Sequence, residues 1–334
     1  MRLLTLIIAL FMAPAALAQA MPTCTGLDLY AQLKKDNPAL AQTMVQEAAS
    51  QLYGEGVYFS VSKAGGTPST IMGTFHITDQ RIADLPPAVA KRLENADVVA
   101  LEIIEQLDPQ KAAALTMQNM DKMFYTDGTS LADRLSPEDA KAVEAKALAM
   151  GMPWSTSSKL RPFFLMAMMG LPACERARDA AGLPSLDDRL GQQALKAGKS
   201  VVGLETMVGQ LESVAYLPEE MKLQALVEAA QIKFATEDVL ETMVQFYLKG
   251  ETGMLWSMMN RFTPQGFGGE SQIAKNAAFQ RIMLDKRNVT MADGSAKLID
   301  EGNAFIAVGA LHLPGEKGLL NLLAQRGYTI ERIQ

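Results

Sequence analysis

The sequence predicts an α/β fold of three layers, in which a mixed central sheet lies between helices. Strand-like segments are few and short, and long helical stretches separate them. Two of these segments, 98–101 and 305–308, are continuously apolar, so helices must cover both faces of the sheet. In chain order, the expected strands are 57–61, 69–75, 97–102, 200–205, 304–308 and 328–333.

Helix signals fill the stretches between these strands. Ser136 is a good N-cap, Pro137 fits the first turn, and Gly151 ends the pattern, which together predict a helix over about 137–150. Apolar residues recur at helical spacing through 219–250, which predicts one or two amphipathic helices.

The chain from 19 to 334 is expected to form one domain, because no linker, low-complexity tract or internal repeat interrupts it. A mainly helical insertion is expected around 107–196 and 207–290. Its helices would decorate the sheet as a lid or as a wall of a substrate site.

The N-terminal segment 1–18 has the pattern of a secretory signal peptide. Arg2 precedes an apolar run that ends in the small residues Ala16-Leu17-Ala18. This run is too short to span a bilayer comfortably. We therefore expect a periplasmic or secreted protein with no stable membrane insertion after signal cleavage.

Charge and cysteine content narrow the partners and the compartment. Acidic residues outnumber basic ones, 37 to 31, and the net charge of −6 argues against a nucleic-acid partner. The two cysteines, Cys24 and Cys174, are an even number in a chain expected to enter an oxidising compartment. We expect them to form one disulfide; two free buried thiols are the alternative.

The chain contains two histidines, His76 and His312, and the glycines Gly73 and Gly309 stand three residues before them. Imidazole is the commonest metal ligand in proteins and titrates near neutral pH. Each histidine follows an apolar strand, and glycine would let the backbone approach its neighbour closely there. The repeated pattern predicts that the two rings share one site.

Two similar apolar strands each end on a glutamate, Glu102 and Glu205. Ligands of open α/β sheets bind at the carboxyl ends of the strands, where the histidines are also expected. Two neutral imidazoles and a carboxylate leave open positions on a divalent cation, which lowers the pKa of bound water and polarises a carbonyl. For each glutamate alone, a solvated charge at a strand end is the alternative.

Several further motifs accompany these residues in a fixed order. They are Gly73-Thr74-Phe75-His76, Glu102, Gly203-Leu204-Glu205-Thr206 with Gln210, Arg287-Asn288, and the tail 308–315 through Gly327-Tyr328. In this order and in these strand contexts they resemble the TraB/PrgY/GumN family, which includes the Tiki-type metalloproteases. The resemblance covers most of the chain after the signal segment. It implies a fold like that of the erythromycin esterases and the haem-binding ChaN-type lipoproteins, and a hydrolase that uses a divalent ion such as Mn²⁺, Co²⁺ or Zn²⁺.

The resemblance also implies roles for single residues. His76 and His312 would be metal ligands, with Glu102 as the acidic residue beside them. Arg287 corresponds to the basic residue ahead of the second histidine, where it would clamp a substrate carboxylate or stabilise an oxyanion, and Asn288 would donate to the same oxygen. A cation at a helix C-terminus is the alternative for Arg287.

The expected function is that of an exported metal-dependent hydrolase acting on a peptide or another small substrate, with Glu102 or Glu205 managing the proton. The chain has neither HExxH nor GxSxG, so the common zinc-peptidase helix and the serine-hydrolase elbow are excluded. The alternative is a non-catalytic exported protein that sequesters a peptide, haem or metal. Family resemblance alone suggests a third role, as an accessory factor for envelope polysaccharide.

Methionine is abundant, with 21 in the chain and clusters at 165–169 and 257–259. We expect these side chains mainly to fill the core, because methionine adapts to irregular gaps. A groove for peptides or other apolar chains and a Cu(I) site are the alternatives.

Overall fold

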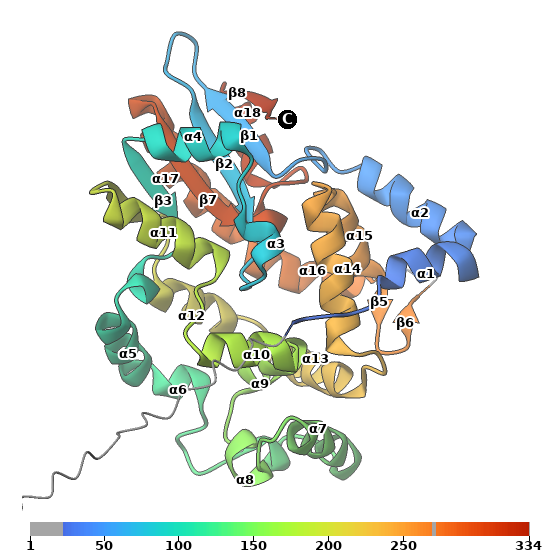
Figure 1. Ribbon diagram of the computed structural model, residues 1–334. Helices are drawn as coiled ribbons and strands as arrows, with labels where there is room; N and C mark the ends of the chain where they lie inside the picture. Colours follow the sequence, from blue (N-terminus) through green and yellow to red (C-terminus); the bar gives the residue numbers. More distant parts are fainter. Residues whose placement is uncertain (1–22, 269–271, 334) are drawn as a thin grey trace, which may run out of the picture.

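The computed structural model describes residues 23–268 and 272–333. The expected signal peptide at 1–18 lies outside the described residues. A six-stranded mixed sheet in the order β4-β3-β7-β2-β1-β8 forms the centre of the molecule (Figure 1). The strands are β1 Tyr58–Ser62, β2 Ser69–Thr74, β3 Val98–Leu101, β4 Ser200–Gly203, β7 Ala304–Gly309 and β8 Thr329–Arg332.

All six expected strands are therefore present, within about two residues of their predicted ends. β4, β3, β7 and β2 run parallel, whereas β1 is antiparallel to both of its neighbours, β2 and β8. A separate two-stranded ladder of β5 (Phe262–Thr263) and β6 (Gly266–Phe267) was not expected from the sequence.

The register of the parallel strands brings their carboxyl ends to one edge. Thr74, the last residue of β2, is opposite Gly309, the last residue of β7. Leu101, the last residue of β3, is opposite Gly203 at the end of β4. Residues that follow these four strands therefore emerge side by side.

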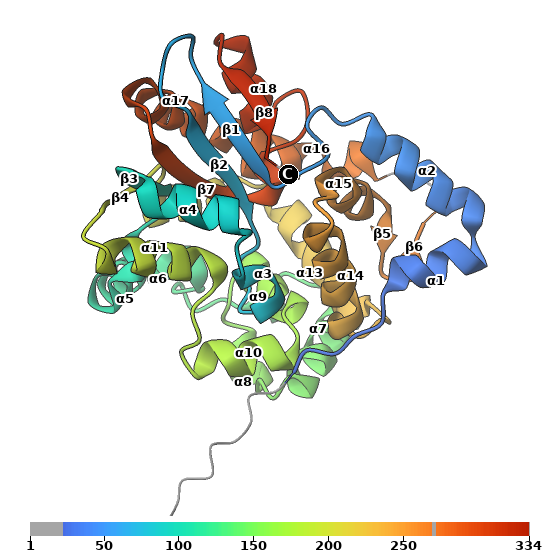
Figure 2. The same ribbon diagram turned by 45° about the horizontal axis from the view of Figure 1, so that its top comes forward.

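Helices cover both faces of the sheet, as the apolar strands require (Figure 2). The core on one face includes residues of α4 (Pro87–Asn95), α11 (Leu186–Lys196) and α14 (Thr236–Leu248). The core on the other face includes residues of α17 (Lys286–Glu301) and α18 (Leu319–Gln325). The structure thus has the expected mixed α/β architecture with a layer of helices on each side.

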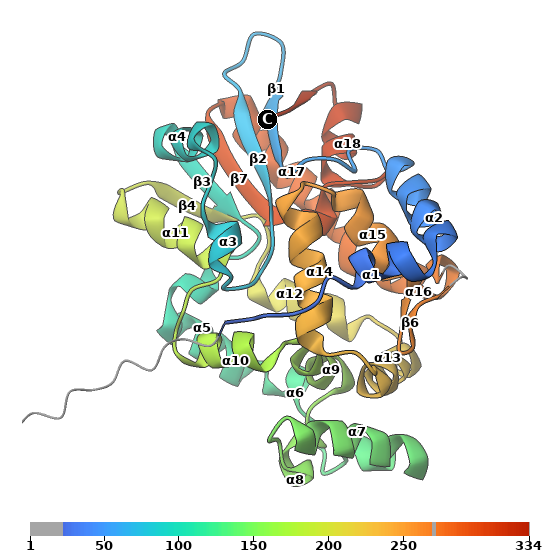
Figure 3. The same cartoon turned by 45° about the vertical axis from the view of Figure 1, so that its right-hand side comes forward.

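Along the chain, most of the other helices come between β3 and β4 or between β4 and β7. Of these helices, α7 and α8 lie farthest from the sheet (Figure 3). A smaller core joins α7, α9 and α13. The α-helices not yet given are α1 Leu29–Asp36, α2 Pro38–Ala49, α3 Gln80–Ala83, α5 Pro109–Gln118, α6 Met120–Met123, α7 Pro137–Ala149, α8 Trp154–Ser157, α9 Pro162–Gly170, α10 Ala173–Ala180, α12 Met207–Ala215, α13 Glu219–Gln231, α15 Thr252–Arg261 and α16 Ile273–Gln280.

Two helix predictions can be compared directly with the structure. The helix expected over 137–150 is α7, and the Ser136 hydroxyl accepts a hydrogen bond from the Asp139 amide as the cap requires. The amphipathic stretch 219–250 forms two helices, α13 and α14, with a break between Gln231 and Thr236.

The disulfide between Cys24 and Cys174 is present, and it ties the N-terminal arm to α10. Of the clustered methionines, Met169 and Met258 are buried in hydrophobic cores, as core filling predicts, whereas Met168 is exposed. Within 23–268 and 272–333, no helix has the length and hydropathy needed to cross a membrane.

Candidate active site

The candidate site forms where three neighbouring strands end. His76 lies two residues beyond β2, Glu102 follows β3 directly, and His312 closes the short 3₁₀ turn Ala310–His312 after β7. Although they are far apart in sequence, the parallel register places these three residues at one sheet edge. The convergence expected from the sequence is therefore present.

The three side chains meet at one carboxylate oxygen. Oε1 of Glu102 lies 3.8 Å from Nε2 of His76 and 3.6 Å from Nε2 of His312. Two ligands that each lie about 2.1 Å from one tetrahedral ion are about 3.4 Å apart, so these separations suit ligands of a common cation. As the described side chains are placed, no group of three or more His, Cys, Asp or Glu could hold a metal ion, so a metal here is a proposal that requires the side chains to adjust.

Gly309 keeps the space between the three side chains open. A Cβ atom at this position would lie 3.0 Å from Nε2 of His76, 3.1 Å from Oε1 of Glu102 and 3.5 Å from Cδ2 of His312. The Gly309 amide also donates a 2.6 Å hydrogen bond to Oε1 of Glu102. This is the close approach for which a glycine ahead of the histidine was expected.

His312 is buried, and its ring is held through Nδ1. Oδ1 of Asn288 lies 2.6 Å from Nδ1 of His312, while Nδ2 of Asn288 donates to the carbonyl oxygen of Lys317. The second bond sets the orientation of the amide, so Nδ1 of His312 must be the donor and Nε2 keeps its lone pair. Burial lowers the pKa of His312 to about 4, against the opposing effect of Glu102, and the ring is neutral at pH 7.

His76 is held differently, because 56% of its side chain is exposed. Its Nδ1 lies 2.8 Å from Oδ2 of Asp187, a residue of α11. The Asp187 carboxylate raises the pKa of His76 to about 9. A cation bound at Nε2 would have to displace the proton that Nε2 carries when the ring is protonated.

Glu102 is buried and ionised. Burial favours its neutral form, but His312, His76 and Arg287 outweigh burial and lower the pKa of Glu102 to about 2. Its Oε2 accepts hydrogen bonds from Nη2 of Arg287 at 2.7 Å and from Nε2 of Gln210 at 3.1 Å. The two oxygens therefore face different partners: Oε1 faces the histidines and Oε2 faces Arg287.

Arg287 joins the two glutamates. Its Nε and Nη2 atoms also donate to Glu205, at 2.9 and 2.7 Å to Oε2, and its Nη1 donates to the carbonyl oxygen of Met283. The guanidinium fork is thus occupied by protein groups, which favours a role in holding the carboxylates over clamping a substrate. Arg287 lies in the first turn of α17, so the alternative of a cation at a helix C-terminus is wrong.

The contacts with Arg287 also exclude the alternative that the two glutamates are solvated charges. The side chains of Glu102 and Glu205 are 8% and 11% exposed, and both pair with Arg287, so neither is a solvated charge at a strand end. Asn288 uses both ends of its amide on His312 and Lys317. A donor role of Asn288 toward substrate stays a prediction.

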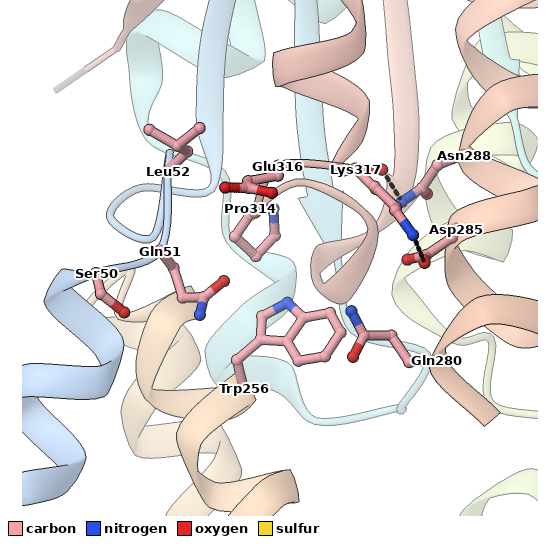
Figure 4. Close-up of a pocket in the computed structure, with 12 residues that line it drawn as sticks. Ser50, Gln51, Leu52, Trp256, Gln280, Asp285, Asn288, Pro314, Glu316 and Lys317 are labelled. Carbon is pink, nitrogen blue, oxygen red and sulfur yellow. Dashed lines mark hydrogen bonds and ion pairs between the residues drawn. The ribbon is translucent and has the colours of Figure 1, made fainter. Parts of the chain in front are cut away.

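The site opens into a cavity of about 220 Å³. His76 and Glu102 line it together with the apolar residues Leu101 and Ile103. A larger cavity of about 370 Å³ is lined by Asn288 and Trp256, and neither histidine lines it (Figure 4). The smaller cavity is the one that leads to the candidate centre.

Sequence reasoning missed Asp187 as a site residue and assigned no contact to Thr74 and Gln210. Thr74 donates a 2.7 Å hydrogen bond to Oδ1 of Asp187, and Gln210 bridges Glu102 and Glu205. Asp187 is one of the two acidic residues in the first turn of α11, where the helix dipole by itself explains a carboxylate. Nothing near it in the sequence pointed to His76.

Comparison with known proteins identifies the family that the motifs resemble. A model of the TraB/PrgY/gumN family matches residues 57–332. The uncharacterized protein YbaP of Shigella flexneri is 23% identical over 264 residues, covering 79% of this chain and 90% of that protein. The metalloprotease TIKI1 of Danio rerio is 24% identical, covering 79% of this chain and 60% of that protein. No solved structure is significantly similar, so the expected likeness to the erythromycin-esterase and ChaN-type folds stays a prediction.

Proposed function

The chain belongs to the TraB/PrgY/gumN family, and we propose that it is a divalent-metal-dependent hydrolase that cleaves peptide bonds. The observation that carries the proposal is the meeting of His76, His312 and Glu102 at the ends of three neighbouring strands. The relative from Danio rerio that is named a metalloprotease supports the same class of reaction.

The donor set suits a hydrolytic metal centre. Nε2 of His76, Nε2 of His312 and Oε1 of Glu102 would hold the ion, and two imidazoles with one carboxylate are a known ligand set of zinc hydrolases. Mn²⁺ and Co²⁺ are accommodated by the same nitrogen and oxygen donors. When bound, such an ion polarises a carbonyl group and lowers the pKa of a water molecule.

The surrounding residues prepare this donor set. Asn288 holds the neutral ring of His312 with Nε2 unprotonated, and Arg287 keeps Glu102 ionised and oriented. Gln210 and Arg287 connect Glu102 to Glu205, so the two carboxylates are held in fixed positions beside one positive charge. In this proposal Arg287 acts through the carboxylates and does not contact substrate.

The compartment proposed for this reaction is the periplasm or the cell exterior. The disulfide between Cys24 and Cys174 supports it, because disulfides persist in oxidising compartments.

Metal analysis and peptidase assays test the proposal. Purified protein would be assayed on a peptide library with added Mn²⁺, Co²⁺ or Zn²⁺, and hydrolysis should require one of them. His76→Ala and His312→Ala should reduce activity to background, whereas Gln51→Ala, which changes the walls of cavities that contain neither histidine, should not. Full activity in both histidine variants would refute the proposal. Metal binding without hydrolysis would instead support the non-catalytic alternative.

A further inference from the structure

The two rings of the candidate centre have unequal partners. The neutral amide of Asn288 holds the buried ring of His312, and the carboxylate of Asp187 holds the exposed ring of His76. Water competes with protein groups for the hydrogen bonds of an exposed imidazole, and an exposed ring can also turn to other rotamers. A charge-assisted bond resists that competition better than a neutral one.

Asp187 is itself firmly placed. It lies in the first turn of α11 and is only 6% exposed. The capping box of this helix uses Ser185 and Asp188, which leaves the carboxylate of Asp187 available for the site. One oxygen accepts from the Thr74 hydroxyl at 2.7 Å, and the other lies 2.8 Å from Nδ1 of His76.

Thr74 and His76 come from the same Gly-Thr-Phe-His motif at the end of β2. Residues two apart at a strand end can face the same side, and here both reach one carboxylate from α11. The motif therefore supplies both His76 and Thr74, and Thr74 holds the Asp187 carboxylate that in turn holds the ring of His76.

We propose that Asp187 is a positioning residue for His76, anchored by Thr74, which fixes the ring orientation and the tautomer that leaves Nε2 free for a cation. An ionised carboxylate can only accept hydrogen bonds, so Nδ1 of His76 must carry the proton. Carboxylates bound to the outer nitrogen of a metal-ligating histidine act in this way. The inference rests on the proposed function, because it assigns Nε2 of His76 to a metal.

Asp187→Ala is the decisive variant because it removes the acceptor that faces Nδ1 of His76. The ring then loses the bond that fixes its orientation and its tautomer. In calorimetric titrations with Zn²⁺, the dissociation constant should rise about 10- to 100-fold. Asp187→Asn should keep most of the affinity, because its amide oxygen can accept from Nδ1 while its NH₂ group donates to the Thr74 hydroxyl, as Asn288 does for His312. Asp293→Ala, which removes an exposed carboxylate paired with Arg326, should leave the affinity unchanged.

Nuclear magnetic resonance gives a readout independent of metal and activity. The chain has only two histidines, so ¹⁵N-histidine labelling yields two ring patterns. The Asp187 carboxylate raises the pKa of His76 to about 9, so spectra of the metal-free protein are recorded well above pH 9, where the ring is neutral. The native protein and Asp293→Ala should then show His76 protonated at Nδ1, and Asp187→Ala should show it protonated mainly at Nε2, the tautomer that a neutral imidazole favours in water. His312 should be unchanged in all three.

The outcomes separate this inference from the proposed function. Unchanged Zn²⁺ affinity and an unchanged His76 tautomer in Asp187→Ala would overturn the role of Asp187. If the native protein binds no metal, the proposed function fails, and the spectra still decide whether Asp187 sets the tautomer. Thr74→Val removes the hydroxyl that holds Asp187 and keeps the carboxylate, so it should weaken Zn²⁺ binding less than Asp187→Ala does, and it supplies the comparison if that variant does not fold.

Discussion

Replacing Gly309 with alanine should weaken metal binding while the fold survives. The new methyl group would lie 3.0 Å from Nε2 of His76 and 3.1 Å from Oε1 of Glu102, where ordinary contacts begin at 3.4 Å. The two donor atoms must therefore retreat by about 0.3 to 0.4 Å, which exceeds the tolerance of about 0.2 Å in metal–ligand distances. We expect the affinity for Zn²⁺ or Mn²⁺ to fall at least about tenfold, a loss of about 1.4 kcal/mol.

The backbone of Gly309 does not oppose the substitution. Its φ of −52° and ψ of 136° are allowed for alanine, so the cost to folding comes only from crowding, about 1–3 kcal/mol. Calorimetric titration with metal and urea unfolding would be measured on the same preparation. Gly170→Ala is the matched control, because a Cβ atom there meets nothing within 4 Å. Native metal affinity in Gly309→Ala would refute the assignment of the shared site.

Three further predictions concern stability. Arg287→Met leaves Glu102 buried without its cation and should lower the free energy of unfolding by about 3–5 kcal/mol in urea titrations; a loss below 1 kcal/mol would contradict the pairing. In the metal-free protein, the pKa of His76 is raised from 6.5 to about 9, and that of His312 is lowered from 6.5 to about 4. The folded state therefore loses stability relative to the unfolded chain as the pH rises from 6.5 through 9, because it must release the proton that it binds more tightly. It also loses stability as the pH falls from 6.5 toward 4, because the unfolded chain gains a proton that the folded state excludes. His76→Gln should flatten the alkaline arm of the unfolding profile and His312→Gln the acid arm; unaltered arms would rule out this linkage. Gly73→Ala places a Cβ atom 2.7 Å from a leucine methyl and 3.0 Å from a backbone Cα, so it should destabilise the fold by about 1–3 kcal/mol, and an unchanged urea midpoint would show that the loop yields.

Much of the scaffold could be predicted because its signals are local. Continuous apolar runs such as Val98–Leu101 mark strands covered on both faces, and that strand is almost entirely buried in the structure. A cap such as Ser136 marks the start of a helix within four residues of chain. The pairing of Cys24 with Cys174 followed from the number of cysteines and the expected compartment.

The histidine pair could also be predicted, since the chain has only two and both follow strands of one sheet. The short β5–β6 ladder was not predicted, because strands of two residues carry no periodic signal.

The sequence by itself determined the kinds of elements, the residue types at the strand ends and the two rings that would meet. The tertiary structure alone decided their partners: that Asp187 holds His76, that Asn288 holds His312, and that Arg287 binds both glutamates. Periodicity and capping act over a few residues and leave a mark in the chain. A hydrogen bond between residues over a hundred positions apart, such as that of Thr74 with Asp187, depends on strand order and helix packing, which no local pattern encodes.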